Sequence, residues 1–134
     1  MCIRDSYIAS AVAKAKANGY TETMTGRRRP LPELHSTDRL TLVNAENIAV
    51  NSPIQGSAAD LIKLAMIKVD RDLRETGLKT KLLLQVHDEL VFEAPKSEVD
   101  RASEVIRDAM ERAMELDVPL KVEIGTGANW LEAH

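Results

Sequence analysis

The sequence predicts an α+β fold in which helices back a small antiparallel sheet. Three observations carry this prediction. Two Leu- and Val-rich strand segments meet at His87-Asp88, long segments with helical apolar spacing flank them, and residues 118–124 alternate apolar and polar side chains. This order of hairpin, helix and strand is typical of one antiparallel layer covered by helices. A chain of 134 residues, 44% of them apolar, is long enough for a single core.

The first part of the chain is expected to hold a leader and a helix. Residues 1–6 match no pattern that follows, so we interpret them as a non-native leader and residues 7–134 as the part of the chain that forms the fold. Residues 7–18 place apolar side chains at helical spacing. Gly19 is expected to end this helix as a glycine C-cap.

Two short β segments, 21–24 and 28–31, come next and predict an N-terminal β-hairpin around Thr25-Gly26. Prolines at the end of the second arm confine it to a sheet edge. Residues 35–50 are harder to assign. Asp38 offers a helix start, but no further element is defined there.

A strong helix is predicted over residues 57–75, after Pro53 and Gly56 interrupt the chain, and Gly77 is expected to end it. Ser57 and Asp60 resemble a capping box at its first turn. Its buried stripe is expected to hold the apolar residues Ala58, Leu61, Ile62, Ala65, Val69 and Leu73.

The C-terminal half is expected to contain a tight hairpin, a second helix and a last strand. Strands 81–86 and 89–93 leave two residues for the turn, which suits an antiparallel hairpin. Ser97 is expected to cap a helix that runs to residue 116, with Val99, Ala102, Ile106, Ala109, Met110 and Ala113 as its stripe. Residues 118–124 are expected to add a half-buried strand to the sheet.

Composition and charge favour an ordinary intracellular globular protein. The net charge of -3 argues against nucleic-acid binding when taken alone. The acidity is uneven, however: residues 1–94 carry a net charge of +1 and residues 95–134 a net charge of -4. A single cysteine, Cys2, forms no disulfide within the chain, and no apolar run is long enough for a membrane span. We therefore expect no membrane partner and a cytoplasmic location.

The polar run Val86-His87-Asp88-Glu89 between two apolar strands is the sharpest motif. A rigid hairpin tip with acidic side chains suits Mg²⁺, which prefers carboxylate oxygens and keeps open positions for water and phosphate oxygens. The alternative is a tip that is polar only because it meets solvent. The residues alone leave both explanations open.

Two further motifs could contact nucleic acid. Asn51 and Gln55 carry amides that can bond to base or sugar atoms. A proline-bounded helix entry explains the surrounding residues but not Gln55. A basic turn formed by Arg27, Arg28 and Arg29 could contact phosphates, or could be an ordinary solvated turn.

Two runs of the sequence closely resemble the C-terminal end of family A DNA polymerases. They are Asn-Ser-Pro-Ile-Gln-Gly-Ser-Ala-Ala-Asp-Leu-Ile-Lys at 51–63 and Leu-Gln-Val-His-Asp-Glu-Leu-Val-Phe-Glu at 84–93. Residues 23–34 are similar to the β-hairpin that follows the last fingers helix of this family, and residues 118–134 to its final strand and C-terminus. The resemblance covers residues 7–134, in order and without large gaps.

The resemblance implies part of a polymerase palm and the end of the fingers. In that reaction a primer 3′-hydroxyl attacks the α-phosphate of a dNTP on primer-template DNA, as in replication and repair, with two Mg²⁺ ions as cofactors. By matching positions, Asp88 and Glu89 are the catalytic carboxylates: Asp88 is the metal ligand, and Glu89 is its acidic neighbour, which tunes position rather than acting as an obligatory ligand. His87 would lie near the primer terminus. Gln55 and Asn51 would reach the minor groove of the nascent duplex.

The resemblance also implies that much of the active site lies outside this chain. The family's other metal-binding aspartate and its triphosphate-gripping helix are upstream, so the rest of the polymerase chain is required and the fragment alone is expected to be inactive. The residues themselves are also compatible with two other classes of protein. One is a non-catalytic α+β binding or assembly module. The other is a metal-dependent hydrolase, which would need further ligands near Asp88.

Overall fold

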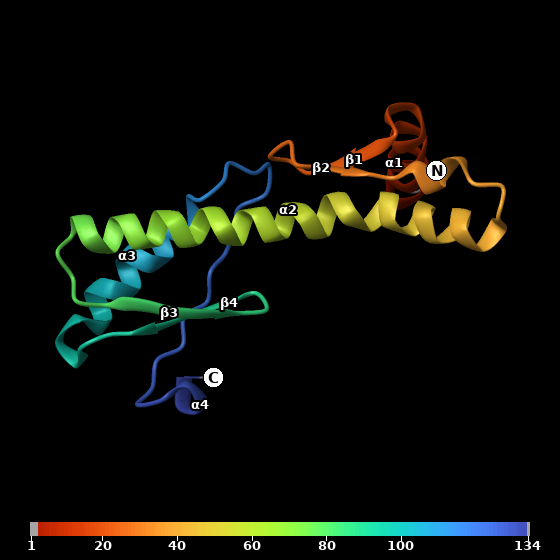
Figure 1. Cartoon of the computed structure of the whole chain (residues 1–134). Helices are drawn as coiled ribbons and strands as arrows, with labels where there is room; N and C mark the ends of the chain where they lie inside the picture. Colours follow the sequence, from red (N-terminus) through yellow and green to blue (C-terminus); the bar gives the residue numbers. More distant parts are fainter. Residues whose placement is uncertain (1–2, 134) are drawn as a thin grey trace. The chain divides into compact units, whose positions relative to one another are not determined.

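The computed structural model describes residues 3–133 and confirms the α+β class, with helices and two separate two-stranded antiparallel sheets (Figure 1). The elements, in chain order, are α1 (Ile3–Asn18), β1 (Tyr20–Glu22), β2 (Arg28–Pro30), the 3₁₀ turn η1 (Pro32–His35), α2 (Arg39–Glu75), β3 (Lys81–Val86), β4 (Glu89–Glu93), the 3₁₀ turn η2 (Lys96–Glu98), α3 (Val99–Glu111) and α4 (Trp130–Ala133). The chain forms two compact units, one up to Asp60 and the other from Leu61.

Helix α1 ends as the sequence predicts but begins earlier. Gly19 has a positive φ of 79°, and its N–H donates to the carbonyl of Ala15 at 2.8 Å, which is a glycine C-cap. The helix begins at Ile3 rather than at residue 7. Residues 3–6 are therefore helical, whereas Met1 and Cys2 lie outside the described residues. That residues 1–6 are a non-native leader stays a prediction.

The first unit buries a small apolar core between α1, the segment after β2, and the first turns of α2. Its buried members are Ala15, Leu31, Leu34, Ala45 and Ala49. The predicted N-terminal hairpin is confirmed: β1 pairs antiparallel with β2, with Thr21 opposite Arg29 and Glu22 opposite Arg28. A five-residue turn joins the two strands, and Gly26 within it has a φ of 89°.

Helix α2 differs from the prediction, because it runs for 37 residues through Pro53 instead of starting at Ser57. A proline inside a helix loses one backbone hydrogen bond and costs about 3 kcal/mol. Packing outweighs this local cost, since Ala45 and Ala49 are buried in the turns before Pro53. The Tyr7 hydroxyl of α1 also donates to the carbonyl of Val50 in the same turn, at 3.0 Å. The predicted cap at Ser57 is therefore wrong.

The predicted helix start at Asp38 is confirmed. Its carboxylate accepts hydrogen bonds from the Thr41 hydroxyl at 2.6 Å and from the Thr41 backbone N–H at 3.0 Å. This is the N-cap arrangement that satisfies an otherwise unpaired N–H of the first turn. These two hydrogen bonds hold the pKa of Asp38 below its ordinary value of 3.8, and the bond from the Thr41 hydroxyl has the larger effect.

The lowered pKa of Asp38 predicts a pH-dependent helix start. Because the folded-state pKa is below the ordinary 3.8, the cap's contribution is fully present above pH 3.8 and is lost as the pH falls through the lowered value. The amide chemical shift of Thr41, followed by NMR, is expected to titrate with a midpoint below 3.8. Asp38→Asn is the control and should abolish this titration. A midpoint at or above the ordinary value would contradict the cap.

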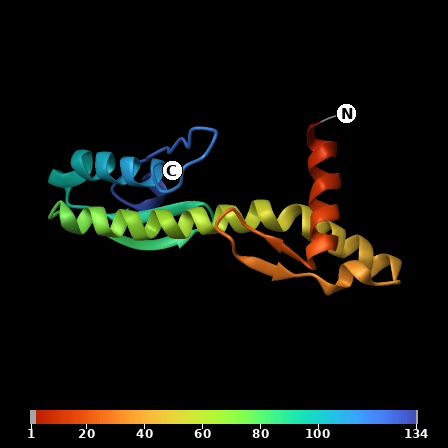
Figure 2. The same ribbon diagram turned by 90° about the horizontal axis from the view of Figure 1, so that it is seen from above.

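The second unit packs α3 along the last turns of α2, as two views show (Figure 2). Gly77, with a φ of 72°, ends α2, which confirms the predicted end of that helix. The buried residues Val69 and Leu73 of α2 meet one face of α3, formed by Ala102, Ile106 and Ala109. Leu78, Phe92, Val105 and Met110 pack around them. Of the twelve residues predicted for the two buried stripes, six are buried, five are half-buried and Ala58 is exposed.

Strands β3 and β4 have the predicted bounds and form one antiparallel hairpin, from the pair Lys81–Glu93 to the pair Val86–Glu89. The register shifts between Leu82 and Leu84, which marks a β-bulge. The hairpin base is held by η2. The Glu98 carboxylate accepts hydrogen bonds from the backbone N–H of Lys79 at 2.9 Å and of Thr80 at 3.1 Å.

Two C-terminal predictions are wrong. The helix α3 begins at Val99 without a side-chain cap and ends at Glu111, so Ser97 does not cap it and residues 112–116 are outside it. Residues 118–124 form no strand; the backbone N–H of Val122 instead donates to Glu111 Oε1 at 3.3 Å. A strand needs a partner edge for its backbone groups, and among the described residues this segment pairs with neither β3 nor β4.

None of the helices within residues 3–133 has the length and apolar character needed to cross a membrane.

Candidate functional site

The tip of the β3–β4 hairpin presents the predicted acidic motif on a defined turn. His87 has a φ of 52°, and it is the single non-glycine residue with a positive φ among residues 3–133. Gln85 Nε2 donates to the His87 carbonyl at 2.9 Å, which ties the turn to strand β3. His87, Asp88 and Glu89 are all exposed at the end of the paired strands. The strands therefore hold these side chains at a fixed, solvent-accessible edge.

This tip can supply a metal ligand but no complete metal site. Within residues 3–133, no three His, Cys, Asp or Glu side chains gather to hold an ion. The Asp88 carboxylate fits one part of a Mg²⁺ site, because this cation is commonly held by one or two carboxylates, waters and phosphate oxygens. The metal-dependent hydrolase alternative needed additional ligands near Asp88, and the described residues do not place them there.

The amide motif lies in the middle of α2. Asn51 and Gln55 are four residues apart, so they lie on one face of the helix, and both are exposed. Sequence analysis had placed them before a helix N-terminus. A continuous helix holds them more rigidly than a loop would, because their backbones are part of its hydrogen-bond ladder.

The basic turn and one of these amides are brought together in the first unit. A hollow of about 260 Å³ is lined by Thr21, Thr23, Arg27, Arg28, Arg29, Ser52, Gln55 and Gly56. Asn51 does not line the hollow. The tip residues His87, Asp88 and Glu89 belong to the second unit.

The three arginines have different surroundings. Arg27 Nε lies 3.0 Å from Asp60 Oδ1, and its Nη2 donates to the Gly56 carbonyl at 3.3 Å. Arg28 stacks over the Tyr20 ring, 4.5 Å from the ring centroid, and its Nε lies 3.9 Å from Glu22 Oε1 at the exposed surface of the hairpin. The side chain of Arg29 makes no hydrogen bond or ion pair within the described part of the chain. Arg27 thus contacts the buried Asp60, whereas the side chains of Arg28 and Arg29 are exposed.

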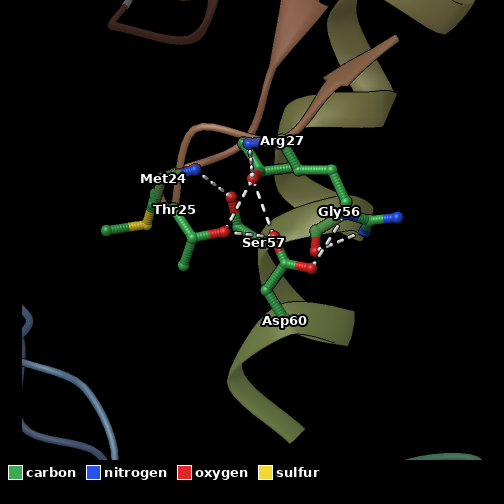
Figure 3. Close-up of polar contacts among 7 residues, drawn as sticks. Met24, Thr25, Arg27, Gly56, Ser57 and Asp60 are labelled. Carbon is green, nitrogen blue, oxygen red and sulfur yellow. Dashed lines mark hydrogen bonds and ion pairs between the residues drawn. The ribbon is translucent and has the colours of Figure 1, made fainter. Parts of the chain in front are cut away.

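A cluster that sequence analysis missed joins the β1–β2 turn to α2 (Figure 3). The carboxylate of Asp60 accepts hydrogen bonds from the hydroxyls of Thr23 at 2.7 Å and Thr25 at 2.6 Å. Ser57 Oγ accepts a bond from the backbone N–H of Met24 at 2.9 Å. Ser57 and Asp60 were assigned to a helix start, which accounted for their polarity within an apolar stripe. An acid in a buried helical position was the signal that could have revealed the cluster.

Gly56 lets the turn approach the helix in this cluster. A Cβ at Gly56 would lie 2.7 Å from Thr23 Cγ2, which is too close for two carbons. The requirement for glycine here is one of space, since no positive φ is involved.

Comparisons with known proteins agree on one family. The family described as "DNA polymerase family A" matches residues 4–132. The DNA polymerase I of Mycobacterium tuberculosis (strain CDC 1551 / Oshkosh) is 52% identical over 128 residues, covering 96% of this chain and 14% of the relative. The DNA polymerase I of Bacillus subtilis (strain 168) is 49% identical over 128 residues, with the same two coverages. The chain thus spans only 14% of the length of these relatives.

A solved structure is also similar to most of this chain. It is described as the POL domain of Pol1 from M. smegmatis in complex with DNA primer-template and dNTP. The TM-score is 0.94 at 48% sequence identity, and the match covers 96% of this chain and 23% of the other.

Proposed function

We propose that this chain, which belongs to DNA polymerase family A, forms the C-terminal part of the polymerase domain of a DNA-directed DNA polymerase. The complete enzyme would transfer a nucleotide from a dNTP to a primer 3′-hydroxyl under template direction, in DNA replication and repair. The observation that carries this proposal is the exposed Asp88 at the tip of a rigid hairpin, within a chain that matches the family from residue 4 to residue 132.

Family A DNA polymerases use divalent metal ions, and we propose two Mg²⁺ ions for the complete enzyme. Bound Mg²⁺ stabilises the negative charge that develops on the attacking and leaving oxygens of phosphoryl transfer. In this chain, Asp88 is the proposed metal ligand. Glu89 is the neighbouring acid that keeps the local charge negative and orients its neighbour. His87 is proposed to lie beside the primer terminus.

The exposed amides of α2 are proposed to contact the minor groove of the nascent duplex. Correct base pairs all present acceptors at common positions in the minor groove, so an amide donor there checks geometry without choosing sequence. Gln55 and Asn51 have this donor, and one helix face holds both. This role explains why two neutral amides, rather than lysines, stand on that face.

The basic turn is proposed to contact DNA phosphates. Arg28 and Arg29 are the stronger candidates, because both are exposed and line the hollow beside Gln55, and the ion pair of Arg28 with Glu22 is long, at 3.9 Å. Arg27 lines the same hollow but is already bound to Asp60 and Gly56. Phosphate contacts of this kind position the duplex without reading its sequence.

The proposal requires the rest of the polymerase chain as a partner, together with primer-template DNA and dNTP. One carboxylate cannot assemble a two-metal site by itself, and the described residues add no other ligands to it. We place the complete enzyme in the bacterial cytoplasm, at the nucleoid, where its DNA substrate lies.

The function is tested by a segment exchange. In M. tuberculosis DNA polymerase I, this chain replaces the C-terminal segment that it matches, and template-directed primer extension is measured with Mg²⁺. We expect extension from the exchanged polymerase and none from the purified 134-residue chain. Extension by the isolated chain would contradict the requirement for the rest of the enzyme. A folded exchanged protein that binds DNA but never extends primers would favour a non-catalytic binding module.

A further inference from the structure

Asp60 is the centre of the contacts that hold the β1–β2 turn against α2 (Figure 3). Its side chain is 9% exposed, and its carboxylate receives three donors from one short segment of the turn. These are the hydroxyls of Thr23 and Thr25 on Oδ2 and the Nε of Arg27 on Oδ1, at 2.7, 2.6 and 3.0 Å. Removing the donors from a buried carboxylate of this kind costs free energy, because the charge-assisted bonds are lost and the charge stays buried.

The turn has little else to fix it there. None of residues 20–30 belongs to the buried apolar core, and β2 is exposed along its whole length. The remaining contacts are also polar: the Met24 N–H bonds to Ser57, and Arg27 bonds to the Gly56 carbonyl. Thr21 is buried at the base of the hairpin, but no side chain of the turn at 23–27 is buried, so the position of the turn depends on the Asp60 contacts.

The position of the turn determines where the basic side chains lie. Arg28 and Arg29 follow Arg27 directly, and together with Gln55 of α2 they line the hollow of about 260 Å³. Asp60 lies five residues after Gln55 on the same helix, and it does not line the hollow. It therefore acts on the hollow through Thr23, Thr25 and Arg27.

We propose that Asp60 is a positioning residue for DNA binding: it fixes the β1–β2 turn to α2, so that Arg28 and Arg29 meet DNA phosphates beside the helix face that carries Gln55. This inference rests on the proposed polymerase function. It assigns Arg27 to the protein and Arg28 and Arg29 to the nucleic acid.

The proposal is tested in the exchanged polymerase by measuring the Kd for labelled primer-template DNA over a range of salt concentrations. Each phosphate contact contributes about 0.9 to the slope of log Kd against log salt. Asp60→Ala is expected to raise the Kd about tenfold at low salt and to lower this slope by about 2. The kcat at saturating DNA and dNTP should stay close to that of the unaltered protein.

Two further variants separate positioning from stability. Thr25→Val removes an exposed hydroxyl that bonds to Asp60 and to the Thr23 hydroxyl, so the protein should fold, with a smaller change in the same direction. In a variant with Arg28→Gln and Arg29→Gln, adding Asp60→Ala should change the slope no further, because the contacts are already lost. Asp70→Asn is the matched control on the same helix, with a 53% exposed side chain, and should change neither quantity.

The outcomes distinguish the two proposals. If the unaltered exchanged polymerase binds and extends DNA but Asp60→Ala and Thr25→Val leave the salt slope unchanged, Asp60 serves stability alone and the inference is overturned. The inference is also overturned if adding Asp60→Ala to the double arginine variant lowers the salt slope by as much as it does in the otherwise unaltered protein. If the unaltered polymerase neither binds nor extends DNA, the proposed function fails, and this inference fails with it.

Discussion

Asp88→Asn in the exchanged polymerase is expected to lower kcat by about three orders of magnitude, equivalent to about 4 kcal/mol of transition-state stabilisation. Asparagine keeps the shape of the side chain but removes the negative charge that a divalent cation requires. The Kd for primer-template DNA should change much less, because Asp88 is assigned to the reacting phosphates rather than to the duplex. Single-turnover extension rates and DNA titrations together measure the two effects.

The control for Asp88 is Asp117→Asn, an exposed aspartate in the segment after α3, which should leave both quantities unchanged. Glu89→Gln is expected to reduce kcat by a smaller factor, since Glu89 is assigned to support its neighbour. Near-normal turnover by Asp88→Asn would remove Asp88 from the metal role. An equal loss of DNA affinity would instead assign it to duplex binding.

Ile106→Ala is expected to destabilise the second unit by about 2–5 kcal/mol, the usual cost of truncating a buried aliphatic side chain. Ile106 is 8% exposed and packs in the cluster that joins α3 to the last turns of α2. Removing its outer carbons leaves a cavity that the neighbouring alanines are too short to fill. Urea unfolding and the hydrogen-exchange protection of α3 amides measure the loss.

Ile67→Ala provides a matched comparison, because the same substitution is made on α2 at a side chain that is 68% exposed. Its effect should stay within about 0.5 kcal/mol, as is usual for surface positions. Equal losses for the two variants would show that the α2–α3 contact contributes little to the stability of this unit.

Local sequence signals predicted the elements whose bonds are local. The β3–β4 hairpin has the predicted bounds because two Leu- and Val-rich segments and a two-residue turn define it. Gly19 and Gly77 likewise end helices as expected, because a positive φ is a property of the residue itself. In both cases the information lies within a few residues of the feature.

The sequence failed where distant contacts decide the structure. Pro53 is a strong local signal to end a helix, yet buried Ala45 and Ala49 and the Tyr7 hydroxyl keep that turn of α2 helical. The alternation over 118–124 predicted a strand, but alternation supplies no partner edge. Both errors arise because the deciding groups lie far away in the sequence.

The candidate site residues were named from the sequence, whereas the contacts that hold them were not predicted. Asp88, Gln55 and the arginines were all identified as candidates, and the structure places the arginines beside Gln55. Residue types alone indicated what each could bind. They did not reveal that Asp60 and Thr25, from opposite sides of Pro53, share a hydrogen bond.

The hairpin of β3 and β4 has a further consequence for handling this protein. Among the described residues, each strand pairs on one side only, so the outer edges expose backbone donors and acceptors beside Leu83 and Leu84, which are 53% and 42% exposed. An apolar strand with an uncovered edge can template another chain and start self-association. Light scattering of the isolated chain should therefore depend on its concentration, and dilute solutions are the appropriate condition for its spectroscopy.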